Sequence, residues 1–354
     1  MPTTLQVHRT DIDTTRIDTT PTAALSPGQA RFAIESFALT ANNISYASAG
    51  AFLGYWDFYP VDEPWGQVPA MGHAELVECT VDGVEPGGRY FGFFPMADEV
   101  VVDAEANGGG LWASGDHRAP HAAVYRQYSD LRTDPTHDPD REDQVALMRG
   151  LFMTSFLAED MLADTNNRGA AATVVTSASS KTSIALAWCL QQRGTRAIGL
   201  TSARNVDFVT GLGCYDQVVT YDNIGDLDGS EAATVVDMAG NGAVLHQVHS
   251  HYGDQLACSV TVGATHHDAD RPTDALPGPT PEFFFAPGQI EKRNADWGPG
   301  EVMARIGASW SRFADFSDGW LEVVRCQGPD AVTAAYDDVV NGRRSPADGL
   351  ICSM

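Results

Sequence analysis

The sequence predicts an α/β protein with a doubly wound parallel sheet and a separate β-rich region. Between residues 172 and 264, short apolar runs alternate with segments of helical period, as in parallel strands connected by helices. Between residues 28 and 103, apolar and polar residues alternate with a period of two, interrupted by Gly- and Pro-containing turns. The length of 354 residues fits two domains.

The β-rich region is expected to begin the fold. Its strand-forming segments are RFAIESFALT (31–40), ELVECTV (75–81) and RYFGFFPMADEVVVDA (89–104). The composition becomes polar from about residue 105 to 145, where Pro135 and Pro139 oppose a continuous helix. We therefore interpret 105–145 as an excursion or a linker.

The second half of the chain changes to the alternating pattern. We expect helices at 145–163, 179–194 and 204–213, and strands at 172–177, 196–202, 216–221, 233–240 and 255–265. Residues 332–354 return to a helix followed by a short strand. A parallel sheet of this kind binds its ligand at the carboxyl ends of its strands.

The composition excludes several classes of protein. With 22 basic and 47 acidic residues the net charge is −25, which repels nucleic acid and anionic lipid surfaces. The six cysteines form no C-x-x-C pair, and the apolar segment 151–162 is too short and too acidic to span a bilayer. The first residues show no secretion signal, so we expect a cytoplasmic protein with reduced thiols that binds neither nucleic acid nor membranes.

The turn after the first parallel strand is a candidate phosphate site. A helix N-terminus at this point offers backbone N–H groups to a pyrophosphate, usually through a glycine-rich turn. Here the turn contains no glycine, but it has hydroxyl groups and a cation: Ser177, Ser179, Ser180, Lys181 and Thr182. The alternative is that these serines only cap the helix.

The end of the second parallel strand indicates which dinucleotide would bind. An Asp or Glu there holds the ribose 2′-hydroxyl of NAD, whereas a 2′-phosphate needs hydroxyls and a cation. No carboxylate occurs before Asp207; the residues present are Thr201, Ser202, Arg204 and Asn205. An arginine can bind phosphate oxygens with two N–H groups, so the sequence favours NADPH over NADH.

The segment 172–221 resembles the cofactor segment of the medium-chain dehydrogenase/reductase superfamily, in its zinc-independent quinone-oxidoreductase and enoyl-reductase branch. Ser202, the pair Leu212-Gly213 and Tyr221 stand at matching positions. VVDMAGNG (235–242) resembles the family's "vDxvGG", and SVTVGA (259–264), which contains Gly263, resembles "lvxiG". The resemblance adds Tyr221 and Gly263 to the expected cofactor-binding residues.

The likeness extends over most of the chain. QVPAMGHAELVECTVDGVEPGGRYFGFFP (67–95) resembles the family's substrate-domain pattern, and FFFAPGQIEKR (283–293) is similar to a subfamily catalogued only as a domain of unknown function. The resemblance implies a Rossmann-type domain at 151–290 and a GroES-like substrate domain at 1–150, to which residues 291–354 return. It also implies a homodimer.

No metal site is expected. Zinc members of the superfamily need a cysteine early in the substrate domain, whereas only His73 stands at a matching ligand position. His246, His249 and His251, and the pair His266-His267, are interpreted as polar helix and strand ends.

The catalytic candidates follow from the resemblance. In ALTANNISYASAG (38–50), Asn43 stands at the Asn of the family's "NxxD" and Tyr46 at its Asp, while Gly54-Tyr55 and Tyr59-Pro60 are the two candidate matches to the family's G-x-Y setting. Without zinc, a side-chain donor must stabilise the enolate oxygen that hydride transfer creates. Tyr46 and Tyr55 are the leading donors; the alternative is that each is a packed aromatic residue.

Two functions follow from these patterns. The first is an NADPH-dependent reductase of an α,β-unsaturated carbonyl or a quinone-type small molecule. The second is a non-catalytic or repurposed member of the fold that has lost its cofactor, which the glycine-free turn favours.

Overall fold

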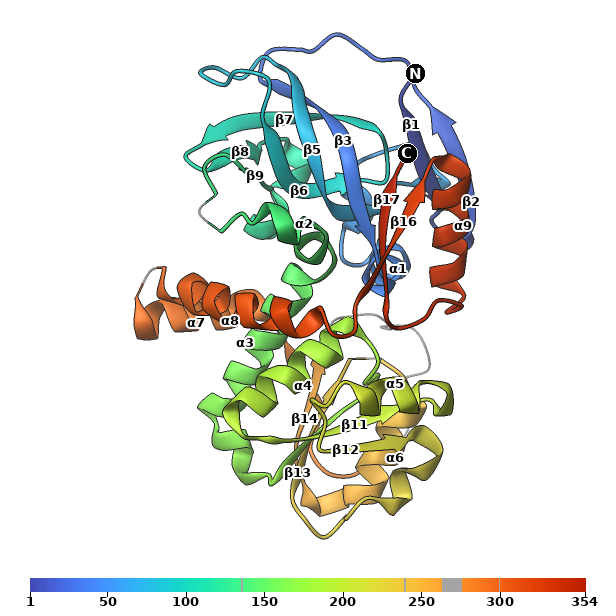
Figure 1. Cartoon of the computed structure of the whole chain (residues 1–354), viewed down its shortest axis with the longest axis vertical. Helices are drawn as coiled ribbons and strands as arrows, with labels where there is room; N and C mark the ends of the chain where they lie inside the picture. Colours follow the sequence, from blue (N-terminus) through green and yellow to red (C-terminus); the bar gives the residue numbers. More distant parts are fainter. Residues whose placement is uncertain (135, 239, 263–275, 299) are drawn as a thin grey trace. The chain divides into compact units, whose positions relative to one another are not determined.

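The computed structural model describes residues 1–134, 136–238, 240–262, 276–298 and 300–354, and it divides into two compact units (Figure 1). Unit 1 comprises Met1–Leu147 and Glu322–Met354, and unit 2 comprises Met148–Leu321. The chain returns to unit 1 at Glu322 rather than near residue 291, because α7 (Ala286–Trp297) and α8 (Glu301–Ser317) pack with α3 (Gly150–Asp164) in unit 2. Gly263 and the pair His266-His267 lie outside the described residues.

Unit 1 is built on an eight-stranded sheet in the order β16-β17-β3-β5-β6-β9-β8-β7. An additional pairing of β3 with β7 closes the strands from β3 to β7 into a ring. The strands are β3 (Gln29–Leu39), β5 (Pro69–Cys79), β6 (Arg89–Pro95), β7 (Glu99–Asn107), β8 (Gly110–Ala113), β9 (Gln127–Asp130), β16 (Glu322–Gln327) and β17 (Asp348–Ser353). This closed sheet is the predicted β-rich domain.

The remaining elements of unit 1 are small. A three-stranded sheet has the order β2-β1-β4, formed by β1 (Thr3–His8), β2 (Asp11–Thr19) and β4 (Trp65–Gly66). The helices are α1 (Ala41–Ser48), α2 (Glu142–Gln144) and α9 (Pro329–Val340), with short 3-10 turns η1 (Tyr55–Asp57), η2 (Asp116–Arg118) and η3 (Ala123–Tyr125).

The segment 105–145 is not a linker. It supplies β8 and β9 to the closed sheet, and the side chains of Leu111, Ala113 and Tyr128 are buried. Both strands are only four residues long, and the connection 114–126 between them has no alternating pattern, so the apolar period was too short to recognise.

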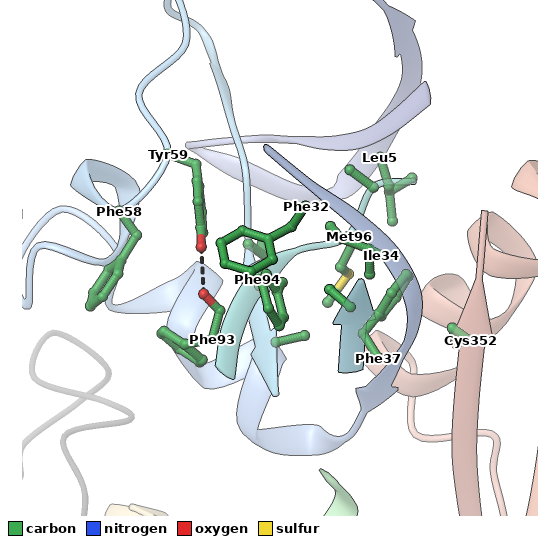
Figure 2. Close-up of a cluster of buried hydrophobic side chains, with 14 of the residues drawn as sticks. Leu5, Phe32, Ile34, Phe37, Phe58, Tyr59, Phe93, Phe94, Met96 and Cys352 are labelled. Carbon is green, nitrogen blue, oxygen red and sulfur yellow. Dashed lines mark hydrogen bonds between the residues drawn. The ribbon is translucent and has the colours of Figure 1, made fainter. Parts of the chain in front are cut away.

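The core of unit 1 is strongly aromatic (Figure 2). Phe32 of β3 contacts Tyr90, Phe94 and Tyr128 with ring centroids 5.1–5.5 Å apart. The buried hydroxyl of Tyr59 donates a hydrogen bond to the Phe93 carbonyl, drawn as a dashed line in Figure 2. Burying large rings supplies much of the apolar area that stabilises such a domain.

Unit 2 confirms the predicted doubly wound parallel sheet. The strand order is β12-β11-β10-β13-β14-β15, and each neighbouring pair is parallel. The strands are β10 (Ala172–Val175), β11 (Arg196–Thr201), β12 (Gln217–Thr220), β13 (Ala233–Asp237), β14 (Leu256–Val262) and β15 (Glu282–Phe284). Its other helices are α4 (Lys181–Arg193), α5 (Val206–Gly211) and α6 (Gly242–Tyr252). In the part of the chain that the structure describes, no helix combines the length and the hydropathy needed to cross a membrane.

The close packing of β5 against β3 yields a stability prediction. A Cβ added at Gly72 would lie 2.3 Å from the Ser36 carbonyl oxygen, a backbone atom that has no room to move within the sheet. We expect Gly72→Ala to lower the free energy of unfolding by about 1–3 kcal/mol. Gly108→Ala is the matched control, because a Cβ there has nothing within 4 Å. Urea midpoints of the two variants measure the difference, and equal midpoints would contradict it.

Candidate functional site

The turn between β10 and α4 has an unusual backbone conformation. Ser177 has a φ of 51°, in the left-handed region where glycine is favoured and other residues are uncommon. The Tyr221 hydroxyl is hydrogen-bonded to the backbone and the side chain of Ser177. Burial raises the pKa of Tyr221, and these two hydrogen bonds reduce that rise. The serine turn thus adopts locally the conformation that a glycine would supply.

The serine hydroxyls of this turn have different hydrogen-bond partners. Ser180 is the N-cap of α4 and accepts a hydrogen bond from the Ser183 backbone N–H at 3.2 Å. Ser179 instead accepts a hydrogen bond from the Asn205 side chain, with Nδ2 and Oγ 3.0 Å apart. Lys181 and Thr182 are the first residues of α4, where backbone N–H groups lack intrahelical partners. The capping role foreseen for the serines therefore applies to Ser180.

The residues after β11 lie beside this turn. The Asn205–Ser179 hydrogen bond joins the end of the second strand to the candidate phosphate turn. Arg204 is exposed and makes no hydrogen bond or ion pair with the rest of the described chain. Thr201 is buried, and its Oγ1 has no partner among the described residues. Ser202 lies between them, immediately before the 3-10 turn Ala203–Asn205.

A buried contact that the sequence reasoning missed joins the ends of β10 and β13. Asp237 is 2% exposed and accepts a hydrogen bond from Thr176 Oγ1 at 2.7 Å. The same Thr176 oxygen accepts from the Met238 backbone N–H at 2.9 Å. A threonine and an aspartate that end neighbouring parallel strands are a recognisable signal for such a pair, since those ends meet at one sheet edge.

The turn also approaches β11 closely. A Cβ added at Gly199 would lie 2.9 Å from the Ala178 side chain and 2.9 Å from the Tyr215 ring. The Tyr215 hydroxyl donates to the Ala178 carbonyl at 2.9 Å. The turn can therefore lie close to β11 because Gly199 of that strand has no side chain, and glycines in the turn itself are not needed.

These features fit a group that bears phosphates. The β10–α4 turn supplies a helix N-terminus and the half-buried Lys181. The end of β11 supplies the exposed Arg204 and the buried Thr201 Oγ1, which has no partner among the described residues. The donor set is that of a phosphate site rather than of a metal site. Among the described residues, no group of three or more His, Cys, Asp or Glu side chains is arranged to hold a metal ion.

In unit 1, the two predicted tyrosines lie together. Tyr46 of α1 stacks on Tyr55 of η1 with ring centroids 4.2 Å apart, and the Tyr46 hydroxyl accepts a hydrogen bond from Asn42 Nδ2 at 2.5 Å. Burial raises the pKa of both phenols, and the neighbouring Tyr125 hydroxyl raises it further. Both phenols are therefore protonated at neutral pH.

Tyr125 was not predicted as a site residue. It comes from η3 in the segment 105–145 and packs edge-on to Tyr55, with centroids 6.2 Å apart. His121 of the same segment stacks on Phe58, with the ring centroids 3.9 Å apart. The misread segment thus contributes directly to the surroundings of the candidate donors.

Asn43 and His73 are buried parts of the fold. The Asn43 side chain accepts from the Thr40 backbone N–H at 2.7 Å and donates to the Pro69 carbonyl at 2.9 Å, so it ties α1 to β5. His73 of β5 is 3% exposed and packs on Phe91, and burial lowers its pKa. The amide of Asn43 is therefore committed to holding α1 in place.

A family model described as "Protein of unknown function (DUF2855)" matches residues 37–345. The chain belongs to this family. This match confirms the prediction that the chain belongs to a subfamily catalogued as a domain of unknown function. A search among curated proteins gave no match.

Solved structures share the fold of the DUF2855 chain. CurA from Vibrio vulnificus matches with a TM-score of 0.64 at 12% identity, over 100% of this chain and 99% of that chain. The CurK enoyl reductase matches with a TM-score of 0.56 at 12% identity, over 100% and 99%. The yhdH oxidoreductase from Salmonella enterica, in complex with NADP, matches with a TM-score of 0.56 at 14% identity, over 100% of both chains. The predicted combination of a Rossmann-type and a GroES-like domain is confirmed.

The Thr176–Asp237 pair can be tested by removing the hydroxyl. We expect Thr176→Val to lower the free energy of unfolding by about 1–3 kcal/mol, because it leaves a buried carboxylate without this donor. Thr173→Val is the control: it is equally buried on β10, but its hydroxyl makes only a 3.4 Å contact with Asn167 Oδ1. Chemical denaturation compares the two, and a Thr173→Val loss as large as that of Thr176→Val would contradict the assignment.

Proposed function

We propose that this protein is an NADPH-dependent, zinc-independent reductase that transfers hydride to an α,β-unsaturated carbonyl or quinone-type small molecule. The observation that carries the proposal is Arg204, an exposed arginine three residues after the end of β11 that makes no hydrogen bond or ion pair with the rest of the described chain. Asn205 beside it is bonded to the candidate phosphate turn. A structure of CurA in complex with NADPH shares the fold with a TM-score of 0.62 at 11% identity, which supports a nicotinamide cofactor for this fold.

Each part of the cofactor has candidate partners in unit 2. The backbone N–H groups at the start of α4, with Ser177, Ser179, Lys181 and Thr182, would bind the pyrophosphate. Ser202 and Arg204 would bind the 2′-phosphate, which a carboxylate at the same place would repel. Thr201, Asn205, Tyr221 and Gly263 complete the proposed set, and Ser180 acts in it through its cap of α4.

The tyrosines of unit 1 would act on the substrate oxygen. When bound, the reduced nicotinamide would supply a hydride to the carbon β to the carbonyl group. The C=C electron pair would then form the double bond of an enolate, whose oxygen takes the C=O pair, and a proton from water would complete the reduction at the α-carbon. Tyr46 and Tyr55 are protonated phenols at neutral pH, since burial raises their pKa above its ordinary value, and their Oη–H groups would donate hydrogen bonds to the developing oxyanion. Asn43 would act as a positioning residue that holds α1, and with it Tyr46.

The alternative is a member of the fold that binds no nucleotide. The Ser180 hydroxyl donates to Ser183 Oγ at 2.8 Å, and the Ser183 hydroxyl donates to the Thr176 carbonyl at 2.8 Å, so both donors are used within the protein, which is the observation that favours it. Mass spectrometry of the purified protein separates the two proposals. Bound nicotinamide nucleotide, or a rise in Tm with NADPH, supports the reductase; neither one at saturating ligand supports the alternative. The cytoplasmic location and the homodimer both remain predictions. Sedimentation of the purified protein tests the homodimer.

Arg204→Ala tests the choice of cofactor. We expect it to weaken NADPH binding by about 1–3 kcal/mol and to leave NADH binding unchanged, because only NADPH carries the 2′-phosphate. Arg196→Ala is the matched control, since Arg196 is an exposed arginine at the opposite end of the same strand, paired with Glu231. Calorimetric titration measures both cofactors. Equal losses for NADPH and NADH would remove the assigned role.

Phenylalanine variants test the proposed donors. We expect Tyr46→Phe or Tyr55→Phe to lower kcat for enone reduction by about 10²- to 10⁴-fold, with NADPH affinity retained. Tyr336→Phe is the control, because its buried hydroxyl has no hydrogen-bond partner among the described residues. Steady-state rates follow the loss of reduced-cofactor absorbance. Full activity in both tyrosine variants would exclude them as donors.

A further inference from the structure

Tyr125 joins the two candidate donors through its hydroxyl. It belongs to η3 in the segment 105–145, whereas Tyr46 belongs to α1 and Tyr55 to η1. The Tyr125 hydroxyl is hydrogen-bonded to the hydroxyls of both Tyr46 and Tyr55. The three phenols therefore form one cluster, in which Tyr125 is the shared member.

The ring of Tyr125 is held by aromatic neighbours. Its centroid lies 4.7 Å from that of Phe93, 5.9 Å from that of Phe58 and 6.2 Å from that of Tyr55. Phe58 and Phe93, both labelled in Figure 2, are each 1% exposed and belong to the core of unit 1. Because a packed core gives little room for movement, a ring that lies against it has a fixed position.

The backbone at Tyr125 is anchored by the next residue, Arg126. Its Nε and Nη2 donate to the Ala113 carbonyl at 3.1 and 3.0 Å, and its guanidinium carbon lies 4.6 Å from the Trp112 ring centroid. Both partners belong to β8 of the closed sheet. The sheet therefore sets where the Tyr125 hydroxyl lies.

The proton count of the cluster leaves one O–H group for a further acceptor. A hydroxyl donates one hydrogen bond and accepts up to two. Tyr125 can donate to only one of its two neighbours, so the other neighbour must donate to Tyr125. The neighbour that accepts from Tyr125 keeps its own O–H. Asn42 Nδ2 also donates to Tyr46 Oη, at 2.5 Å, and this bond uses no phenol proton.

We propose that Tyr125 is a positioning residue of the candidate reductase site, whose hydroxyl orients those of Tyr46 and Tyr55 so that one O–H of this pair is held ready for the carbonyl oxygen of the substrate. The inference rests on the proposed function and narrows it, because the hydrogen bonds to Tyr125 leave one phenol proton for the substrate. Without Tyr125, each hydroxyl of the pair would be free to rotate about its Cζ–Oη bond.

Tyr125→Phe tests this role, because it removes the hydroxyl and keeps the ring that packs on Phe58 and Phe93. We expect kcat for enone reduction to fall about 3- to 10-fold, as for the loss of one hydrogen bond, while KM and NADPH affinity stay within about twofold. Tyr336→Phe is the control, since its buried hydroxyl has no partner among the described residues, and it should leave kcat unchanged. A Tyr125 that serves only through its ring predicts full kcat in the phenylalanine variant.

NMR of the full chain gives a measurement that needs no activity. The Cζ resonance of tyrosine labelled with ¹³C at Cζ responds to the hydrogen bonds of its hydroxyl. Tyr125→Phe should move the resonances of both Tyr46 and Tyr55, assigned through their own phenylalanine variants, and leave that of Tyr336 in place.

The two measurements distinguish this inference from the proposed function. If the unmodified protein reduces no enone, the proposed function fails, and the role of Tyr125 in it fails too. If the unmodified protein is active, full kcat in Tyr125→Phe overturns the inference and leaves the reductase standing. Unmoved resonances of Tyr46 and Tyr55 overturn it as well, because the phenols would then not share hydrogen bonds with Tyr125.

Discussion

The geometry of unit 2 at its proposed cofactor site depends on holding Ser177 in a left-handed conformation, which costs a non-glycine residue about 1–2 kcal/mol. Contacts from three directions offset that cost. Tyr221 bonds to Ser177 itself, Tyr215 holds the following carbonyl, and Thr176 before it is bonded to Asp237 of β13. A glycine turn reaches such a shape through its own freedom, whereas this turn is held by its neighbours, and α4 starts from a fixed point.

The parallel sheet was predictable because its strands are buried runs of β-branched residues. Val174 and Val235 have 0% exposure on the two central strands, and both belong to uninterrupted apolar segments between turns. β15 was not predicted, because it has three residues and exposes Phe283. β8 and β9 were missed for a similar reason: a period of two is hardly visible over four residues.

The candidate site was predictable only where sheet topology brings residues together. Ser179 and Asn205 follow adjacent parallel strands, and they are bonded to each other as that rule requires. No such rule places Tyr125 beside Tyr46 and Tyr55, because the contact depends on how two 3-10 turns and a short helix pack. The structural role of Asn43 could not be predicted either, because its side chain donates to the carbonyl of Pro69, which belongs to a different element, β5.

The sheet of unit 1 pairs an early strand, β3, with a late strand, β17, and the two are synthesised far apart in time. β17 pairs with β3 through Leu350–Leu39, Ile351–Ala38 and Cys352–Phe37, yet all of unit 2 is translated between the two strands. The nascent chain therefore presents the Phe37–Leu39 edge of β3 without its partner while unit 2 is already complete. An unpaired strand edge is a template for pairing with other chains, so the order of synthesis leaves this edge of unit 1 open until β17 has been translated.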